Sequence, residues 1–152
     1  MKRYPRTAVS LLFGINGLQF ASWASRLPDL QARYGLDHGG LGLTLLLLSL
    51  GALLAMPFTG WVITRFGSRR VTVVGGVLFC VFTPVVAFGS EVPLLLGLFF
   101  LLGCSTGMMD VAMNAQAVEV EKWKGRPIMA SFHAVFSMGM MGGAGSGRHA
   151  GE

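Results

Sequence analysis

The chain carries little charge, and long stretches carry none. Only 12% of its 152 residues are Asp, Glu, Lys or Arg, whereas a typical soluble domain has about 25%. Formal charge is absent from residues 38 to 64 and again from 71 to 90, and 53% of the chain is hydrophobic. About 20 apolar residues in a helix cross the hydrocarbon core of a bilayer. The composition therefore excludes an ordinary soluble domain and predicts an all-α integral membrane protein.

Cysteines and catalytic signatures are also scarce. Cys80 and Cys104 both fall in apolar runs, so we expect free, buried thiols rather than a disulfide or a metal pair. The patterns G-x-x-x-x-G-K-[ST] and H-E-x-x-H do not occur. The stretch 103-GCSTG-107 matches G-x-S-x-G, but that motif works on a strand–turn–helix elbow and here lies inside a predicted membrane helix. The sequence therefore predicts no enzyme activity, no metal and no cofactor.

A third absence is that of acidic residues in the short break 60-GWVITRFGSRR-70 between two uncharged runs. Two apolar runs joined by so few residues predict a hairpin of antiparallel membrane helices. A polar loop is expected over 26–40, and Asp37–His38 is typical of a helix N-cap. The predicted spans are about 7–25, 41–63, 71–89, 94–115 and 128–146, followed by a short polar tail at 148–152.

Basic residues concentrate on one predicted side of the membrane. Of the 12 Lys and Arg residues, nine lie at the N-terminus, in the break 60–70 and in the loop before residue 128, and only Arg26, Arg33 and Arg148 lie elsewhere. By the positive-inside rule we expect a cytoplasmic N-terminus, and we expect the protein to reside in the cell (inner) membrane. Because the cations form short clusters between apolar runs, the net charge of +5 indicates anionic lipid headgroups and not nucleic acid as the partner.

The first predicted span carries a polar stripe. Asn16, Gln19 and Trp23 recur at i, i+3 and i+7, so they share one face of a helix. Polar side chains in hydrocarbon face protein or water and not lipid. Two roles fit this stripe: hydrogen bonding between helices, and contact with a transported solute.

Asp110 is the acid of the fourth predicted span. A charged side chain at the centre of a membrane helix costs about 2.5–3.5 kcal/mol on insertion scales, so it is rarely without a role. Gly103, Gly107, Asp110 and Asn114 form one helical stripe, which we expect to face the bundle interior. We interpret Asp110 as a proton- or substrate-binding acid, with a buried acid bonded to a neighbouring helix as the alternative. His133, about two turns into the fifth span, is either a core residue or an aid to this acid.

The break 60–70 resembles the signature loop between the second and third helices of Major Facilitator Superfamily transporters. Gly60, Arg65, Gly67 and Arg69 match that signature in register, Arg70 lies one place beyond its last basic position, and Thr64 stands in place of its acid. The segments 110-DVAMN-114 and 131-SFHAVFS-137 resemble the fucose permease branch of that family. Unlike that branch, this chain has no acid in its first helix.

The resemblance implies twelve helices in two six-helix halves, each half built from two inverted repeats. With about five spans, the chain then corresponds to an incomplete N-terminal half. Its expected function is secondary transport of a small-molecule substrate as a symporter, with protons as the coupling ion, and we expect that the chain does not transport alone. The predicted substrate- or proton-binding residues are Asp110, Asn114, His133, Asn16, Gln19 and Trp23, and the predicted cytoplasmic gate loop comprises Gly60, Arg65, Gly67, Arg69 and Arg70.

A different class remains open. The pairs Gly103–Gly107 and Gly139–Gly143 have the spacing that lets membrane helices approach closely. A small helical membrane protein that uses these glycine faces as an assembly or regulatory partner is therefore the alternative to a transporter.

Overall fold

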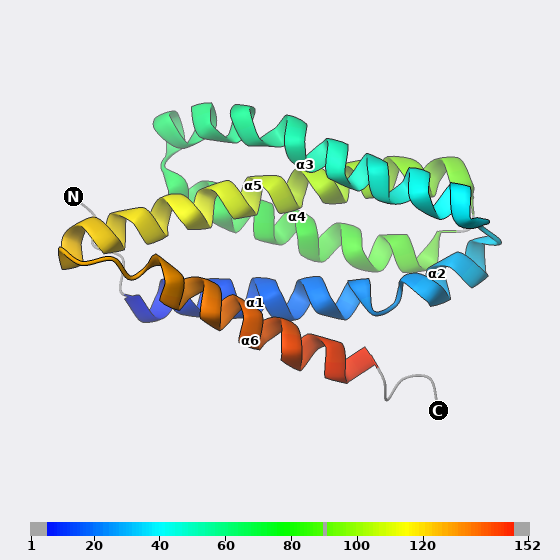
Figure 1. Cartoon of the computed structure of the whole chain (residues 1–152). Helices are drawn as coiled ribbons and strands as arrows, with labels where there is room; N and C mark the ends of the chain where they lie inside the picture. The colour runs from blue at the N-terminus through cyan, green and yellow to red at the C-terminus, as the bar shows by residue number, and fades with distance from the viewer. Residues whose placement is uncertain (1–5, 90, 148–152) are drawn as a thin grey trace. The chain divides into compact units, whose positions relative to one another are not determined.

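The computed structural model describes residues 6–89 and 91–147, and it is built from helices (Figure 1). Within that part of the chain there is no strand, which agrees with the predicted all-α fold. The helices are α1 (Arg6–Ala24), α2 (Leu27–Tyr34), α3 (His38–Phe66), α4 (Ser68–Phe88), α5 (Val92–Lys124) and α6 (Met129–Gly147). The polar tail expected at 148–152 lies outside the described residues.

Among the described residues, three helices are long and apolar enough to cross a membrane: α3, α4 as far as Val86, and α5. They correspond to the second, third and fourth predicted spans. The predicted first and fifth spans coincide with α1 and α6, each 19 residues long, and their crossing of the membrane stays a prediction. Large apolar side chains point outward along the spans, including Leu46, Leu53 and Phe58 on α3 and Val73 and Val77 on α4.

Two connections differ from their predicted form. The loop expected over 26–40 contains the helix α2, in which Pro28 and Asp29 occupy the first turn and Gly35 (φ 59°) follows the end. Pro is tolerated in the first turn of a helix because the N–H groups of that turn have no intrahelical acceptor, so a residue without an N–H loses no hydrogen bond there. Asp37 caps α3 as predicted, since its side chain accepts a hydrogen bond from the Gly40 N–H at 2.7 Å.

The break 60–70 is almost entirely helical. α3 continues to Phe66, α4 begins at Ser68, and Gly67 alone separates them, with a φ of 80° that favours glycine. α5 similarly extends past its predicted end at 115 as far as Lys124. Helical hydrogen bonding therefore runs further into the polar segments than hydropathy alone indicated.

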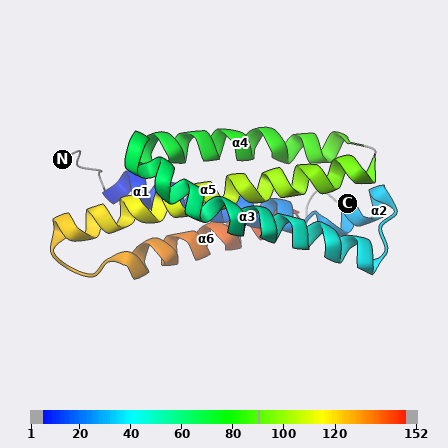
Figure 2. The same ribbon diagram turned by 90° about the horizontal axis from the view of Figure 1, so that it is seen from above.

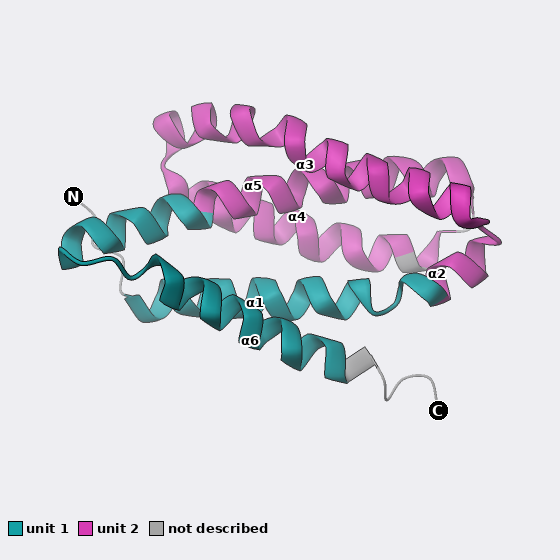
Figure 3. Ribbon diagram, viewed as in Figure 1, with its two compact units in different colours: residues 1–28, 113–152 teal, residues 29–112 magenta. Residues whose placement is uncertain are grey.

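The chain divides into two compact units (Figure 3). Unit 1 comprises residues 1–28 and 113–152, and so holds α1, the end of α5 and α6; unit 2 comprises residues 29–112, and so holds α3, α4 and the first part of α5.

In unit 1, α1 and α6 lie against each other (Figure 1). A Cβ atom at Gly17 would fall 2.9 Å from the Phe136 carbonyl carbon, and one at Gly139 would fall 3.0 Å from the Gly14 carbonyl carbon. Such distances are too short for any side chain larger than hydrogen. Around this contact the core gathers Val9, Phe13, Met113, Ala117, Val120, Ile128 and Phe132.

In unit 2, α5 contacts both α3 and α4 (Figure 2). A Cβ at Gly103 would lie 2.8 Å from the Leu48 carbonyl carbon, and one at Gly107 would lie 2.9 Å from the Ala52 Cα. On the side of α4, a Cβ at Gly75 would lie 3.1 Å from the Met109 nitrogen. Both Gly-x-x-x-Gly pairs thus serve helix packing within a unit, as their spacing predicted.

Cys80 and Cys104 are not joined in a disulfide, and only Cys104 is even partly enclosed. Cys104 is half-buried, whereas Cys80 is exposed, contrary to the prediction of two buried thiols. Cys80 follows Val73 and Val77 at helical spacing, and both valines are more than half exposed. It therefore belongs to the outward apolar face of α4.

Candidate functional site

Asp110 lies on α5 in unit 2 and is half-buried, between Met109 and the fully buried Ala112. Gly103 and Gly107, on the same stripe, lie against the backbone of α3. The glycine part of the stripe therefore faces protein, as predicted. Ser105, the serine of the G-x-S-x-G match, is buried and donates to the Leu101 carbonyl within the same helix at 2.9 Å, so no nucleophile elbow is formed there.

Asn114 follows Asp110 by one turn of the continuous helix α5 and is also half-buried. Four residues correspond to a rise of about 6 Å along a helix. The two polar side chains thus succeed each other along α5, with Asn114 in unit 1 beside the buried Met113.

Asn16, on α1, is the most enclosed of the predicted polar residues, with 6% of its surface exposed. Its Nδ2 donates to the Met113 sulfur at 3.5 Å. A thioether is a weak acceptor, so this contact between helices satisfies the amide poorly. Gln19 is half-buried on the same helix, and Trp23 is buried with its ring edge-on to Phe20 at 5.4 Å.

His133 lies on α6, and its side chain is exposed, so it is not an enclosed core histidine. Its ring meets Phe13 of α1 edge-on, with 5.4 Å between ring centres and 84° between planes. Phe13 also stacks on Phe132 at 5.6 Å. Unit 1 therefore brings His133 and Asn16 to neighbouring turns of α1, since Phe13, which the His133 ring contacts, and Asn16 are three residues apart on that helix.

The predicted gate residues surround the single-residue link between α3 and α4. The Arg65 guanidinium lies over the Trp61 ring at 4.7 Å, and Arg69 and Arg70 are exposed in the first turn of α4. The Thr64 hydroxyl donates to the Trp61 carbonyl of its own helix at 2.7 Å. Gly67 precedes α4 without a side-chain cap, and Gly60 lies within α3.

Sequence reasoning missed Glu121, because it considered only the basic residues of that segment. One oxygen of its carboxylate, Oε2, accepts hydrogen bonds from the Ile128 and Met129 N–H groups, both at 2.8 Å. The usable signal was an acid at the end of one apolar run, followed by a Gly-x-Pro turn and the start of the next run.

The family model of the Major Facilitator Superfamily matches residues 9–149. An uncharacterized MFS-type transporter of Yersinia pestis is 39% identical over 140 residues, which cover 92% of this chain and 36% of that protein. No solved structure matches the chain.

Two further relatives are similar. The uncharacterized transporter y4wD of Sinorhizobium fredii is 40% identical over 143 residues, which cover 94% of this chain and 38% of that protein. Membrane protein MosC of Rhizobium meliloti is 35% identical over 142 residues, covering 93% of this chain and 35% of that protein. The chain thus spans little more than a third of the length of these relatives. Their names do not specify a fucose permease, so that branch stays a prediction.

The family match covers nearly the whole chain, and the relatives named for a function are transporters. Together with the three helices of the described residues that are able to span a bilayer, these findings show that the chain is a multi-pass membrane protein belonging to the Major Facilitator Superfamily, a family of transporters.

Proposed function

We propose that this chain supplies the N-terminal membrane helices of a proton-coupled secondary transporter for a small solute, in the inner membrane and with a cytoplasmic N-terminus. The observation that carries the proposal is Asp110, a half-buried carboxylate within the long apolar helix α5. It precedes Glu119, an exposed acid of the same helix, by nine residues, or about 14 Å of helix rise. An acid at such a depth is costly and typically marks an ion or substrate pathway.

In this proposal Asp110 takes up and releases the coupling proton. Asn114, one turn further along α5, donates a hydrogen bond to the ionised form. The contacts to the solute come from Asn16, Gln19, Trp23 and His133. The weak bond of Asn16 to a thioether favours this role, because a solute hydroxyl or carbonyl would be a better partner for that amide.

Transport by alternating access needs two halves that rock against each other. The relatives are nearly three times as long as the matched segment, so we propose that transport requires the remainder of such a protein. Protons and a small solute are the proposed partners besides the lipid bilayer, and no nucleic acid is expected.

An assembly or regulatory partner is the less favoured function. That alternative relied on glycine faces free to bind other helices. Here Gly103 and Gly107 lie against α3, and Gly139 lies against α1, so packing within each unit occupies these faces.

The test uses a chimaera in which this chain replaces the matching segment of the Yersinia pestis relative. Uptake of a panel of radiolabelled neutral sugars and small carboxylic acids is measured in cells that express the chimaera or this chain alone. We expect uptake of at least one solute by the chimaera only, its loss in Asp110→Asn, and its retention in the matched control Glu119→Gln. Normal uptake by a membrane-inserted Asp110→Asn chimaera would overturn the proposal.

A further inference from the structure

The corner between α5 and α6 is held by a side chain of the helix that precedes it. α5 ends at Lys124, and Gly125 follows with φ +64° and with its N–H bonded to the Glu121 carbonyl at 3.0 Å. The chain then turns through Pro127, and the carboxylate of Glu121 accepts the N–H groups of Ile128 and Met129 at 2.8 Å each. We call this carboxylate with its two amide partners the Glu121 latch.

The unpaired N–H groups at the start of a helix explain why a carboxylate is favourable at the N-terminus of α6. The first N–H groups of a helix have no carbonyl partner within the helix. A negative charge beside them gains from the helix dipole and from charge-assisted hydrogen bonds. Three cations of the same corner, Lys122, Lys124 and Arg126, are exposed, whereas Glu121 is half-buried with its Oε2 directed at the amides. The carboxylate therefore caps α6 while the cations remain on the surface.

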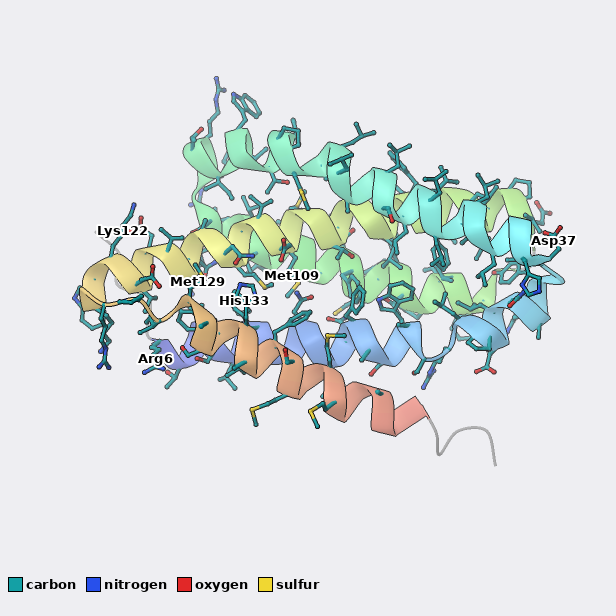
Figure 4. All side chains as sticks on the ribbon, in the orientation of Figure 1. Arg6, Asp37, Met109, Lys122, Met129 and His133 are labelled. Atoms are coloured by element: carbon teal, nitrogen blue, oxygen red, sulfur yellow. The ribbon has the colours of Figure 1, made fainter. Side chains whose placement is uncertain are left out.

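A second contact ties the same turn of α6 to α1. The Arg6 guanidinium donates to the Ser131 hydroxyl at 3.2 Å, and that hydroxyl donates to the Ile128 carbonyl at 2.6 Å. His133 follows Met129 by one helical turn and contacts Phe13 of α1. The start of α6 is thus attached to both other segments of unit 1 next to the turn that carries His133 (Figure 4).

We propose that Glu121 is a positioning residue whose latch fixes the register of α6 against α1, and through it the place of the His133 ring on Phe13. The inference depends on the proposed function only for the solute-binding role of His133. The latch itself is a property of unit 1 and is testable without transport.

The test is nuclear magnetic resonance on the full chain in lipid nanodiscs, comparing wild type with Glu121→Gln. This substitution keeps the size of the side chain and removes its charge. We expect hydrogen exchange at the Ile128 and Met129 amides to accelerate about tenfold, as for the loss of a helix cap. Exchange at Gly125 should stay unchanged, because that amide bonds to the backbone carbonyl of residue 121. The His133 ring signals, which lie beside the Phe13 ring, should shift.

Glu119→Gln is the matched control, since it removes the same charge from an exposed position of the same helix. A merely destabilising effect of Glu121→Gln would lower the unfolding temperature without moving the His133 signals of the folded chain. Unchanged exchange at Ile128 and Met129, unmoved His133 signals, or equal effects in Glu119→Gln would overturn the proposal. A positive result in a protein whose Asp110→Asn chimaera still transports would leave the latch standing and remove the proposed transport site.

Discussion

The two helix corners that carry the predicted cytoplasmic charges are built in opposite ways. Each has three exposed cations: Arg65, Arg69 and Arg70 at the α3–α4 corner, and Lys122, Lys124 and Arg126 at the α5–α6 corner. At the α5–α6 corner an acid of the preceding helix caps the next one. At the α3–α4 corner Thr64 occupies the place of the acid, and its hydroxyl bonds to its own helix.

The difference shows that one carboxylate determines whether the start of the second helix is capped. At the α5–α6 corner the Glu121 carboxylate supplies the cap of α6. At the α3–α4 corner, α4 starts without a side-chain cap and with Arg69 and Arg70 in its first turn, where the helix dipole disfavours cations. At this corner the Arg65 guanidinium lies over the Trp61 ring, and the side chains of Arg69 and Arg70 are exposed.

Both corners are predicted to lie on the cytoplasmic side of the membrane, and the test of this topology has the largest expected effect. A reporter active only in the cytoplasm is fused after Ser68, after Ser90 or after Gly125. We expect activity after Ser68 and Gly125 and none after Ser90, because the basic clusters stay inside. Activity after Ser90 with none after Ser68 would contradict the predicted topology.

A second prediction concerns the feature that the two units share, which is packing through glycine. Gly103→Val in unit 2 and Gly139→Val in unit 1 should each cost about 3 kcal/mol, because the new side chain meets backbone atoms of the partner helix that cannot move aside. Thermal unfolding followed by circular dichroism in detergent measures the loss.

The matched controls are Gly97→Val and Gly142→Val, where a Cβ would meet nothing within 4 Å. These substitutions should leave the unfolding temperature within a few degrees of wild type. Equal losses at all four glycines would show that helix propensity, and not the close approach of helices, determines the effect.

The smallest effect concerns the acid that the α3–α4 corner lacks. Thr64→Asp places a carboxylate near three guanidinium groups and should stabilise the closed cytoplasmic side by about 1 kcal/mol, since exposed ion pairs contribute little more than that. In the chimaera, labelling of a cysteine introduced on the cytoplasmic side should slow several-fold. Thr64→Asn, which adds no charge, is the control. Faster or unchanged labelling in Thr64→Asp would mean that this corner does not act as a gate.

Much of the fold was predictable because hydropathy acts over whole helices. The uncharged runs located five long helices, and the Gly-x-x-x-Gly spacings indicated where they pack. The helix α2 was not predicted, because a short polar segment gives no hydropathy signal. The Glu121 latch was not predicted either, since it depends on the turn at Gly125 that returns the chain to the end of α5.

The candidate site was predictable only in part. The helical stripe through Gly103, Gly107 and Asp110 placed the glycines correctly against another helix. The enclosure of Asn16 and the exposure of His133 depend on how α1 and α6 cross. That crossing angle is set by contacts such as Gly17 on Phe136, which periodicity within one helix does not specify.

The central claim is that Asp110 carries the coupling proton, and proton flux tests it most directly. The chimaera is reconstituted in liposomes that contain a pH-sensitive dye, and a solute that it transports is added outside. Our account predicts acidification of the lumen with the wild-type sequence, and none with Asp110→Asn although exchange of labelled for unlabelled solute across the membrane continues. Solute-driven acidification that persists in Asp110→Asn would contradict the account.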